Sequence, residues 1–289
     1  MNLEWKRSLN LWLLLAPGVG FLLLFFGSPL LLAVLGGFGL DDIGAGEIKF
    51  TLEHYRTMLT DRIYLDGLGF TLYLALASTL LSLLIALPVT ALLQRSFPGQ
   101  RLFNALYKVP LIVPGVVAAF LVLTLADRGG LLPRAFERVG LGFPQLVRDR
   151  WALGVLIGMA WKSVPFMVLV IGGSMAAVPR DVLAASRTLG ANFWQTFLRV
   201  QVPLALPGIT AASLLVFIGA TGAYAIPNLI GPVYPSPISV HMYENAFERN
   251  QWGLVAAMGT VLSLTSSLVL LAYYRLTRDG ENAVNKGGR

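Results

Sequence analysis

The sequence contains no cysteine, two histidines and few charged residues. The absence of cysteine excludes disulfides, thiolate metal sites and a cysteine nucleophile, and His54 and His241 are too few for a histidine metal cluster. Charged residues make up 13% of the 289 residues, against about 25% in soluble domains. This deficit indicates a membrane protein. In such a protein a formal charge of +7 reflects topology and anionic lipid, and we expect no nucleic-acid partner.

Sequence motifs for catalysis are also missing. There is no G-x-x-x-x-G-K-[ST] phosphate loop, so the chain does not bind ATP through that motif. There is neither an H-E-x-x-H nor a G-x-S-x-G pattern. We therefore expect no catalytic residue, no metal and no cofactor in this chain. An integral membrane enzyme or a self-sufficient channel is the alternative class of function.

Long apolar runs dominate the remainder of the sequence. A spanning helix needs about 20 mainly apolar residues. Segments of this kind are Leu9–Leu35, Gly67–Leu93, Ala105–Ala126, Trp151–Ser174, Val202–Gly222 and Trp252–Tyr274. The first run is longer than the apolar region of a signal peptide and more spans follow it, so we interpret it as a retained helix.

These spans predict an all-α integral membrane fold with six transmembrane helices and a cytoplasmic helical loop between the fourth and fifth. We expect residues 1–66 to form the first span and an outer loop, residues 67–274 a five-helix core, and residues 275–289 a cytoplasmic tail. With both termini inside, the inner segments carry slightly more Lys and Arg than the outer ones, although they are shorter. The positive-inside rule therefore modestly favours cytoplasmic termini.

The segment Val178–Pro203 is a polar insert between two apolar spans. Pro179 and Asp181 are typical of a helix start, and Gly190 can adopt the left-handed conformation that ends a helix. Asn192 can cap a second helix, Phe193–Val200, which we expect to end before Pro203. A short helix held across the ends of the spans can fit a groove on a partner protein.

The insert resembles the coupling-loop signature of binding-protein-dependent ABC importer permeases, which is Glu-Ala-Ala, three residues, Gly, and later a Phe and a closing hydrophobic-x-hydrophobic-Pro. Aligned on Gly190, the Glu-Ala-Ala positions hold Ala184, Ala185 and Ser186. The other matching positions are Gly190-Ala191, Phe197, Val200, Val202 and Pro203. Ala184 therefore stands where the family has Glu. A sister permease that keeps the Glu fits this departure, and Asp181, one turn earlier, is a candidate substitute.

The resemblance extends to the flanking spans. The fourth span carries an aromatic residue followed by Pro-Phe in Trp161–Met167, and the run Gly219–Pro232 resembles the branch with polyamine, ferric-iron and phosphonate permeases. The resemblance implies a permease subunit in the prokaryotic inner membrane, surrounded by membrane lipid. It also implies an ATPase subunit dimer that binds ATP and Mg²⁺, a second permease, identical or different, and an extracytoplasmic solute-binding protein. The substrate stays open among polyamine, iron, phosphonate and sugar.

Residues of the fourth and fifth spans are candidates for the pathway. Lys162 lies mid-span, where a charge costs about 2.5–3.5 kcal/mol on insertion scales. It therefore lines a water-filled pathway, snorkels, or packs against backbone carbonyls near Pro165. A cation there argues mildly against a dicationic solute, since no acid lies in any span. By resemblance Tyr224, Pro227 and Asn228 belong to the outer gate, whereas physical chemistry alone gives a turn with an interfacial Tyr.

Overall fold

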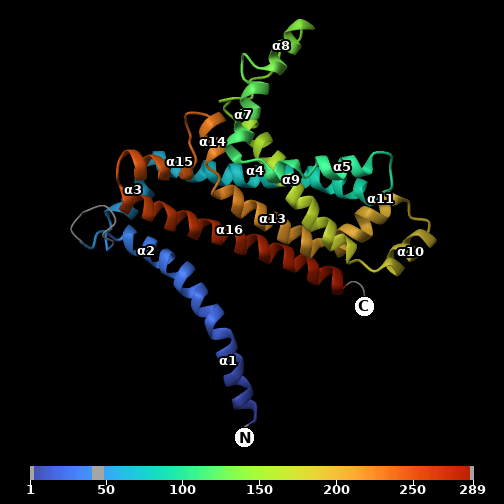
Figure 1. Ribbon diagram of the computed structural model, residues 1–289, viewed down its shortest axis with the longest axis horizontal. Coiled ribbons are helices and arrows are strands. Elements are labelled where there is room, and N and C mark those ends of the chain that lie inside the picture. The colour runs from blue at the N-terminus through green and yellow to red at the C-terminus, as the bar shows by residue number, and fades with distance from the viewer. Residues whose placement is uncertain (1–2, 41–48, 287–289) are drawn as a thin grey trace. The chain divides into compact units, whose positions relative to one another are not determined.

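The computed structural model describes residues 3–40 and 49–286, with side chains described for 12–40 and 49–275. Within these ranges, the regular structure consists of helices (Figure 1). The longer elements are α1 (Leu3–Leu22), α2 (Ser28–Gly37), α4 (Arg62–Leu93), α7 (Gly115–Ala126), α9 (Leu153–Ala176), α13 (Leu206–Thr221) and α16 (Trp252–Lys286). The shorter α-helices are α3 (Glu53–Thr60), α5 (Gln100–Leu106), α6 (Val109–Ile112), α8 (Leu131–Arg138), α10 (Arg180–Thr188), α11 (Phe193–Thr196), α12 (Val202–Leu204), α14 (Ala225–Ile230) and α15 (Ile238–Tyr243). The π-helical turns are η1 (Leu23–Gly27), η2 (Phe197–Gln201) and η3 (Glu244–Glu248).

The number of membrane-spanning helices agrees with the sequence. In the described part of the chain, 5 helices are long and apolar enough to cross a membrane, or 6 when a bent pair counts as one span. The all-α membrane fold with a helical insert between the fourth and fifth spans is therefore confirmed. The last helix is longer than predicted: α16 continues past Tyr274 to Lys286, because no proline interrupts the polar residues that follow the apolar run.

The chain divides into two compact units. One consists of Met1–Leu65 and Met242–Leu264, and the other of Asp66–His241 and Thr265–Arg289. The first unit holds α1, α2 and α3 with the start of α16, and the second holds the bundle of α4, α7, α9 and α13 together with the insert.

The third span begins later than predicted. A continuous helix over Ala105–Ala126 is wrong, because the chain forms α5 and α6 and then breaks before α7. Val113 is extended, with ψ 123°. A residue before proline is disfavoured in the helical region, and Pro114 follows it. The helix restarts at Gly115, and the membrane-length segment is Gly115–Arg138.

The second helix of the insert is also longer than predicted. It does not end at Val200 but continues through Pro203 to Leu204, and a bend of 71° separates it from α13. Proline has no N–H to donate to the preceding turn. The backbone reaches Pro203 through the π-helical turn η2, in which the Val202 N–H donates to the Phe197 carbonyl. The bend falls at Ala205, two residues before Pro207.

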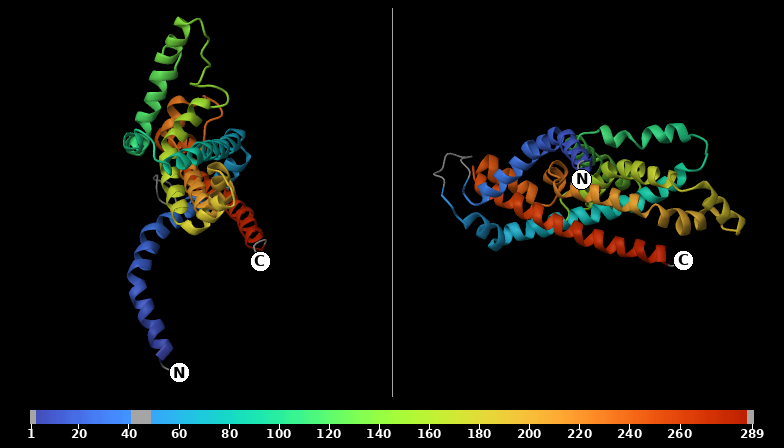
Figure 2. Two further views of the ribbon diagram at one scale, coloured as in Figure 1. Left: turned by 90° about the vertical axis from the view of Figure 1, so that its right-hand side faces the viewer. Right: turned by 90° about the horizontal axis from the view of Figure 1, so that it is seen from below.

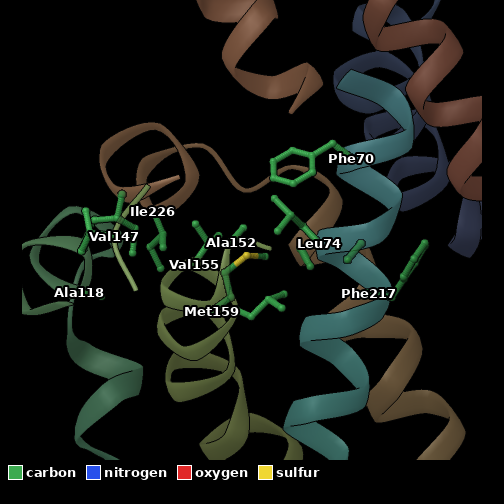
Figure 3. Close-up of a cluster of buried hydrophobic side chains, with 14 residues drawn as sticks. Phe70, Leu74, Ala118, Val147, Ala152, Val155, Met159, Phe217 and Ile226 are labelled. Carbon is green, nitrogen blue, oxygen red and sulfur yellow. The ribbon is translucent and has the colours of Figure 1, made fainter. Parts of the chain in front are cut away.

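One apolar cluster lies where α4, α7, α9, α13 and α14 meet. Figure 3 shows Leu74 of α4 on the side of that helix that faces Val155 and Met159 of α9, with Ile226 of α14 on the far side of Val155. Phe217 of α13 belongs to the same cluster. A second cluster joins α4, α9 and α13 around Met167, Ile171 and Ile209, and it includes Phe197 from the insert. The polar insert is therefore anchored in the apolar core.

Candidate functional site

The insert forms a two-helix hairpin that continues from the end of α9 (Figure 2). Pro179 is the N-cap of α10, with φ −58° and ψ 132°, and Asp181 lies in its first turn. The helix buries none of its residues. Ala184 and Ala185 are both exposed, whereas Ser186 is half-buried on the side that faces the second helix. Within the described part of the chain, the outward surface of α10 is therefore exposed.

The turn between the two helices favours glycine. Gly190 has φ +86°, a left-handed conformation that other L-residues rarely adopt. The Gly190 N–H donates to Arg187 at 2.9 Å and the Ala191 N–H to Ser186 at 3.1 Å, both to backbone carbonyls. This pattern closes the end of α10 as a Schellman motif. Leu189, at the tip, is 89% exposed.

Asn192 caps the second helix, as the sequence predicts, and the cap is a reciprocal capping box with Gln195. The Asn192 side chain accepts from the Gln195 N–H, and the Gln195 side chain accepts from the Asn192 N–H, both at 2.9 Å. The two helices are linked by a hydrogen bond of 3.1 Å between the hydroxyls of Ser186 and Thr196. Reciprocal capping satisfies two N–H groups that otherwise have no intrahelical partner, so the hairpin is locally well defined.

The hairpin is held to the bundle through its second helix. The Phe197 side chain is 1% exposed in the second apolar cluster. Arg95 lies over the ring of Phe193 with 4.7 Å between the guanidinium carbon and the ring centroid, close enough for a cation–π interaction. Pro203 is half-buried within α12. Phe197 therefore joins the second helix of the insert to α4, α9 and α13.

Lys162 does not extend freely into open space. Its Nζ donates a hydrogen bond to the backbone carbonyl of Val113, at the break between α6 and α7. The side chain is half-buried, and Pro165, one turn further along α9, is buried within a continuous helix. Of the predicted possibilities, packing against a backbone carbonyl is the one seen, but the carbonyl belongs to the third span and not to the region around Pro165.

The three gate candidates lie together at the start of α14. Tyr224 is its N-cap, and the Asn228 side-chain amide donates to the Tyr224 hydroxyl at 3.1 Å. Pro227 is buried and Asn228 is exposed. The adjacent Ile226 packs against α9, because a Cβ added to Gly158 would lie 3.3 Å from its Cγ2. The structure thus brings these residues close to the fourth span.

Sequence reasoning missed a close approach between α9 and α13. A Cβ built on Gly208 would lie 2.2 Å from the Cβ of Ser174 and 2.3 Å from its Oγ. The Ser174 hydroxyl also donates to the Ala205 carbonyl at 3.4 Å, next to the bend. The sequence feature that could have indicated this close approach is the glycine directly after Pro207, at the start of an apolar span.

These features define a class of protein: a multi-span membrane protein with a helical hairpin between its fourth and fifth spans. Residues 78–279 match the family described as "Binding-protein-dependent transport system inner membrane component", and the chain belongs to this family. It is the permease subunit of an ABC importer, a non-catalytic, multi-pass protein of the inner membrane.

Two relatives align with most of the chain. The chain is 29% identical over 262 residues to the spermidine/putrescine transport system permease protein PotB of Escherichia coli (strain K12), covering 90% of this chain and 95% of the relative. It is 23% identical over 242 residues to the multiple sugar-binding transport system permease protein MsmF of Streptococcus mutans serotype c, covering 80% and 81%.

Solved structures share the fold. A bacterial ABC transporter involved in the import of the acidic polysaccharide alginate matches with a TM-score of 0.78 at 16% identity, over 96% of this chain and 97% of that chain. The inward-facing MetNI methionine ABC transporter matches with a TM-score of 0.59 at 21% identity, over 74% and 94%. At these identities the likeness shows the type I permease fold alone.

Proposed function

We propose that this permease couples solute import to ATP through the hairpin Val178–Pro203, which docks in a groove of a separate ATPase subunit. The observation that supports this proposal is the two-sided character of the hairpin. The outward surface of α10 makes no buried contact, whereas the second helix is anchored by the buried Phe197. A helix that is exposed on one side and rigidly held on the other suits the helix-in-groove mode of binding.

The exposed surface supplies both apolar and charged contacts for that groove. Leu189 is 89% exposed and Val182 41% exposed, and Asp181 and Arg187 are exposed on the same short helix. Apolar anchors inside a polar rim are typical of interface hot spots. We assign Leu189 as the anchor of the ATPase contact.

The proposed complex contains two permeases, two ATPase subunits that bind ATP and Mg²⁺, and an extracytoplasmic solute-binding protein. One matching structure is a bacterial alginate ABC transporter in complex with a periplasmic protein that holds an alginate pentasaccharide. Both termini and the hairpin lie on the ATPase side in this arrangement. Closure of the ATPase dimer draws the two α10 helices together, and Phe197 transmits the movement to α4, α9 and α13.

Ala184 bears on the identity of the second permease. The exposed methyl group of Ala184 cannot accept the hydrogen bonds that the family's glutamate accepts. We propose a heteromeric pair in which the other permease carries that glutamate. Mass spectrometry of the complex purified in mild detergent tests this directly: a second permease with Glu supports the heteromer, and recovery of this permease alone with the ATPase contradicts it.

We propose a polyamine-type cation as the solute, on the strength of the relative named for spermidine and putrescine. Lys162 is compatible with this choice because its ammonium is already hydrogen-bonded to the Val113 carbonyl. The proposed pathway residues are Lys162, Pro165, Tyr224, Pro227 and Asn228. Uptake of labelled spermidine by proteoliposomes that contain the full complex tests the choice, with excess maltooligosaccharide or phosphonate as competitors. Competition by either of these, without competition by putrescine, would reassign the substrate.

Two variants test the coupling role of the hairpin. Gly190→Pro changes the turn and Ala185→Asp places a charge on the docking surface; both should uncouple transport from ATP hydrolysis without loss of membrane insertion. Gly142→Asp is the control for an added charge, since Gly142 is exposed, lies outside the spans and the hairpin, and has no atom within 4 Å of an added Cβ. Normal uptake by both hairpin variants would exclude the coupling role. Solute flux through proteoliposomes that contain this permease but no ATPase would instead favour a self-sufficient channel.

A further inference from the structure

A cavity of about 180 Å³ lies between α4, α13 and α16. Its lining belongs to the second unit and to three of the membrane spans. Leucine, valine and phenylalanine side chains make up most of the wall, and the polar residues in it are Thr79, Ser213 and Tyr273. The lining contains none of the proposed pathway or hairpin residues, so the proposed function does not explain the cavity.

Two hydroxyl groups in the cavity wall are buried without a hydrogen-bond partner. The side chain of Thr79 is 8% exposed and that of Ser213 is 4% exposed. Neither hydroxyl has a partner among the residues whose side chains are described. Thr210 and Ser266 also lack one there, but they lie outside the lining. A hydroxyl that is removed from water without a replacement hydrogen bond costs free energy, so Thr79 and Ser213 favour a ligand that bonds to both.

Other buried hydroxyls of α4 are satisfied within the helix. Those of Thr71, Ser82 and Thr90 each donate to the backbone carbonyl four residues earlier, at 2.7–2.8 Å. This internal bond is available to Ser and Thr side chains in a helix. Thr79 lies on the same helix without making it, and its position is the cavity wall. Its hydroxyl is therefore available to a ligand.

The size and charge of the cavity limit what it can hold. An apolar protein cavity of about 150 Å³ holds benzene, so this one has room for a six-membered ring with a small polar group. None of the residues that line it carries a charge, and an unpaired charge is costly in apolar surroundings. A polyamine therefore does not suit this cavity, which is distinct from the proposed solute pathway.

We infer that this cavity binds a small neutral aromatic alcohol, with the size of phenol or benzyl alcohol. A hydroxyl both donates and accepts, so that of the ligand can donate to Thr79 or Ser213 and accept from the other. Phe217 and Tyr273 line the cavity with aromatic rings, and contacts between rings add to the stabilisation from buried area. A lipid acyl chain, in contrast, leaves both hydroxyls without a partner.

Photolabelling of the complete transport complex in mild detergent tests the inference. The probe is benzyl alcohol with a diazirine on its ring, and mass spectrometry identifies the labelled peptides. We expect labels at the cavity lining on α4, α13 and α16, and competition by unlabelled benzyl alcohol. Toluene has the same ring without the hydroxyl, so it should compete about tenfold less well, as expected for lost hydrogen bonding.

A double variant tests the two hydroxyls directly. Thr79→Val with Ser213→Ala removes both hydroxyls and leaves the apolar part of the wall in place. Benzyl alcohol should then lose its advantage over toluene, whereas toluene should compete as it does in the parent complex. Thr90→Val is the control, because the Thr90 hydroxyl already donates to the Ala86 carbonyl and lies outside the cavity. It should preserve the difference between the two competitors.

Two results would overturn the inference. One is equal competition by benzyl alcohol and toluene in the parent complex, since the wall hydroxyls would then play no part in binding. The other is the absence of labels on these three helices in the complete complex, which would mean that a lipid acyl chain or the second permease fills the cavity. The readout is binding and needs no ATP hydrolysis, so neither result bears on the proposed coupling role of the hairpin.

Discussion

The ammonium of Lys162 on α9 donates a hydrogen bond to the backbone carbonyl of Val113, where the third span is broken. Val113 is extended and precedes Pro114, so its carbonyl lies outside the regular helical pattern. In a membrane an unsatisfied carbonyl costs free energy because no water reaches it. Lys162 thus links the fourth span to the break in the third, and the mid-span charge has a structural use.

Replacement of this lysine should lower stability. Lys162→Met removes the donor and leaves the Val113 carbonyl without this partner, which costs about 1–3 kcal/mol of unfolding free energy. Lys162→Arg should recover part of the loss because a guanidinium can still donate. Thermal unfolding of the purified protein in detergent measures both changes.

Lys108→Met is the control for loss of a positive charge, since Lys108 is exposed and lies at the start of α6. It should leave stability within about 0.5 kcal/mol of the parent. A pathway-lining role for Lys162 predicts that Lys162→Met keeps full stability but changes solute affinity. That result would exclude a stabilising role for the hydrogen bond between Lys162 and the Val113 carbonyl.

Phe197 should be the most sensitive apolar residue of the hairpin. Its side chain is 1% exposed among α4, α9 and α13, and replacement of a buried Phe by Ala typically costs about 3–5 kcal/mol. Phe197→Ala should therefore lower stability strongly, and transport complexes assembled from any folded variant should take up less solute per ATP hydrolysed by their ATPase subunits. Leu198→Ala, at a side chain that is 57% exposed, should change neither. Equal effects of the two substitutions would argue against Phe197 as the anchor.

The contact between Gly208 and Ser174 permits a reciprocal test. Gly208→Ala places a Cβ 2.2 Å from that of Ser174, and such overpacking costs about 1–3 kcal/mol. Ser174→Gly removes both clashing atoms, so the double variant should be more stable than Gly208→Ala alone. A double-mutant cycle measured by thermal unfolding gives the coupling energy.

Gly173→Ala is the control for this contact, because no atom lies within 4 Å of the added Cβ. It should be neutral or slightly stabilising, as expected when alanine replaces glycine within a helix. Additive effects of Gly208→Ala and Ser174→Gly would show that α9 and α13 are not as closely packed as the structure indicates.

Local features of this chain were predictable, whereas interactions between distant segments were not. The spans follow from length and apolar composition, and the turn at Gly190 and the cap at Asn192 follow from neighbouring residues. Proline alone did not reveal where helices break: Pro165 lies within a continuous helix, while Pro114 follows a break. The outcome depends on tertiary packing around each proline.

The same limit applies to the residues that join the spans. Lys162 was recognisable as a costly mid-span charge, but its acceptor lies 49 residues away. Gly208 was recognisable as a small residue, but Ser174 is on another helix. Contacts between residues of different spans depend on how the helices pack against one another, and the residues near one position in the sequence do not reveal that packing.

The turn of the hairpin should depend on backbone conformation rather than on space. Gly190 has φ +86° and no atom lies within 4 Å of an added Cβ, so a substitution there introduces conformational cost without a clash. That cost is about 1–2 kcal/mol for an ordinary L-residue, and less for Asn, which adopts the left-handed region more readily. Gly190→Val should therefore reorient Leu189 and reduce uptake per ATP hydrolysed, whereas Gly190→Asn should retain most of it.

Gly140 supplies the control, because its backbone is also left-handed but it lies outside the hairpin. It has φ +73° after α8 and equally has no atom within 4 Å of an added Cβ, so Gly140→Val carries a similar backbone cost outside the hairpin. The ratio of solute uptake to ATP hydrolysis in proteoliposomes distinguishes the two sites. Loss of this ratio in Gly190→Val alone would assign the coupling to the shape of the hairpin. Equal loss in both valine variants would mean that a general loss of stability is responsible.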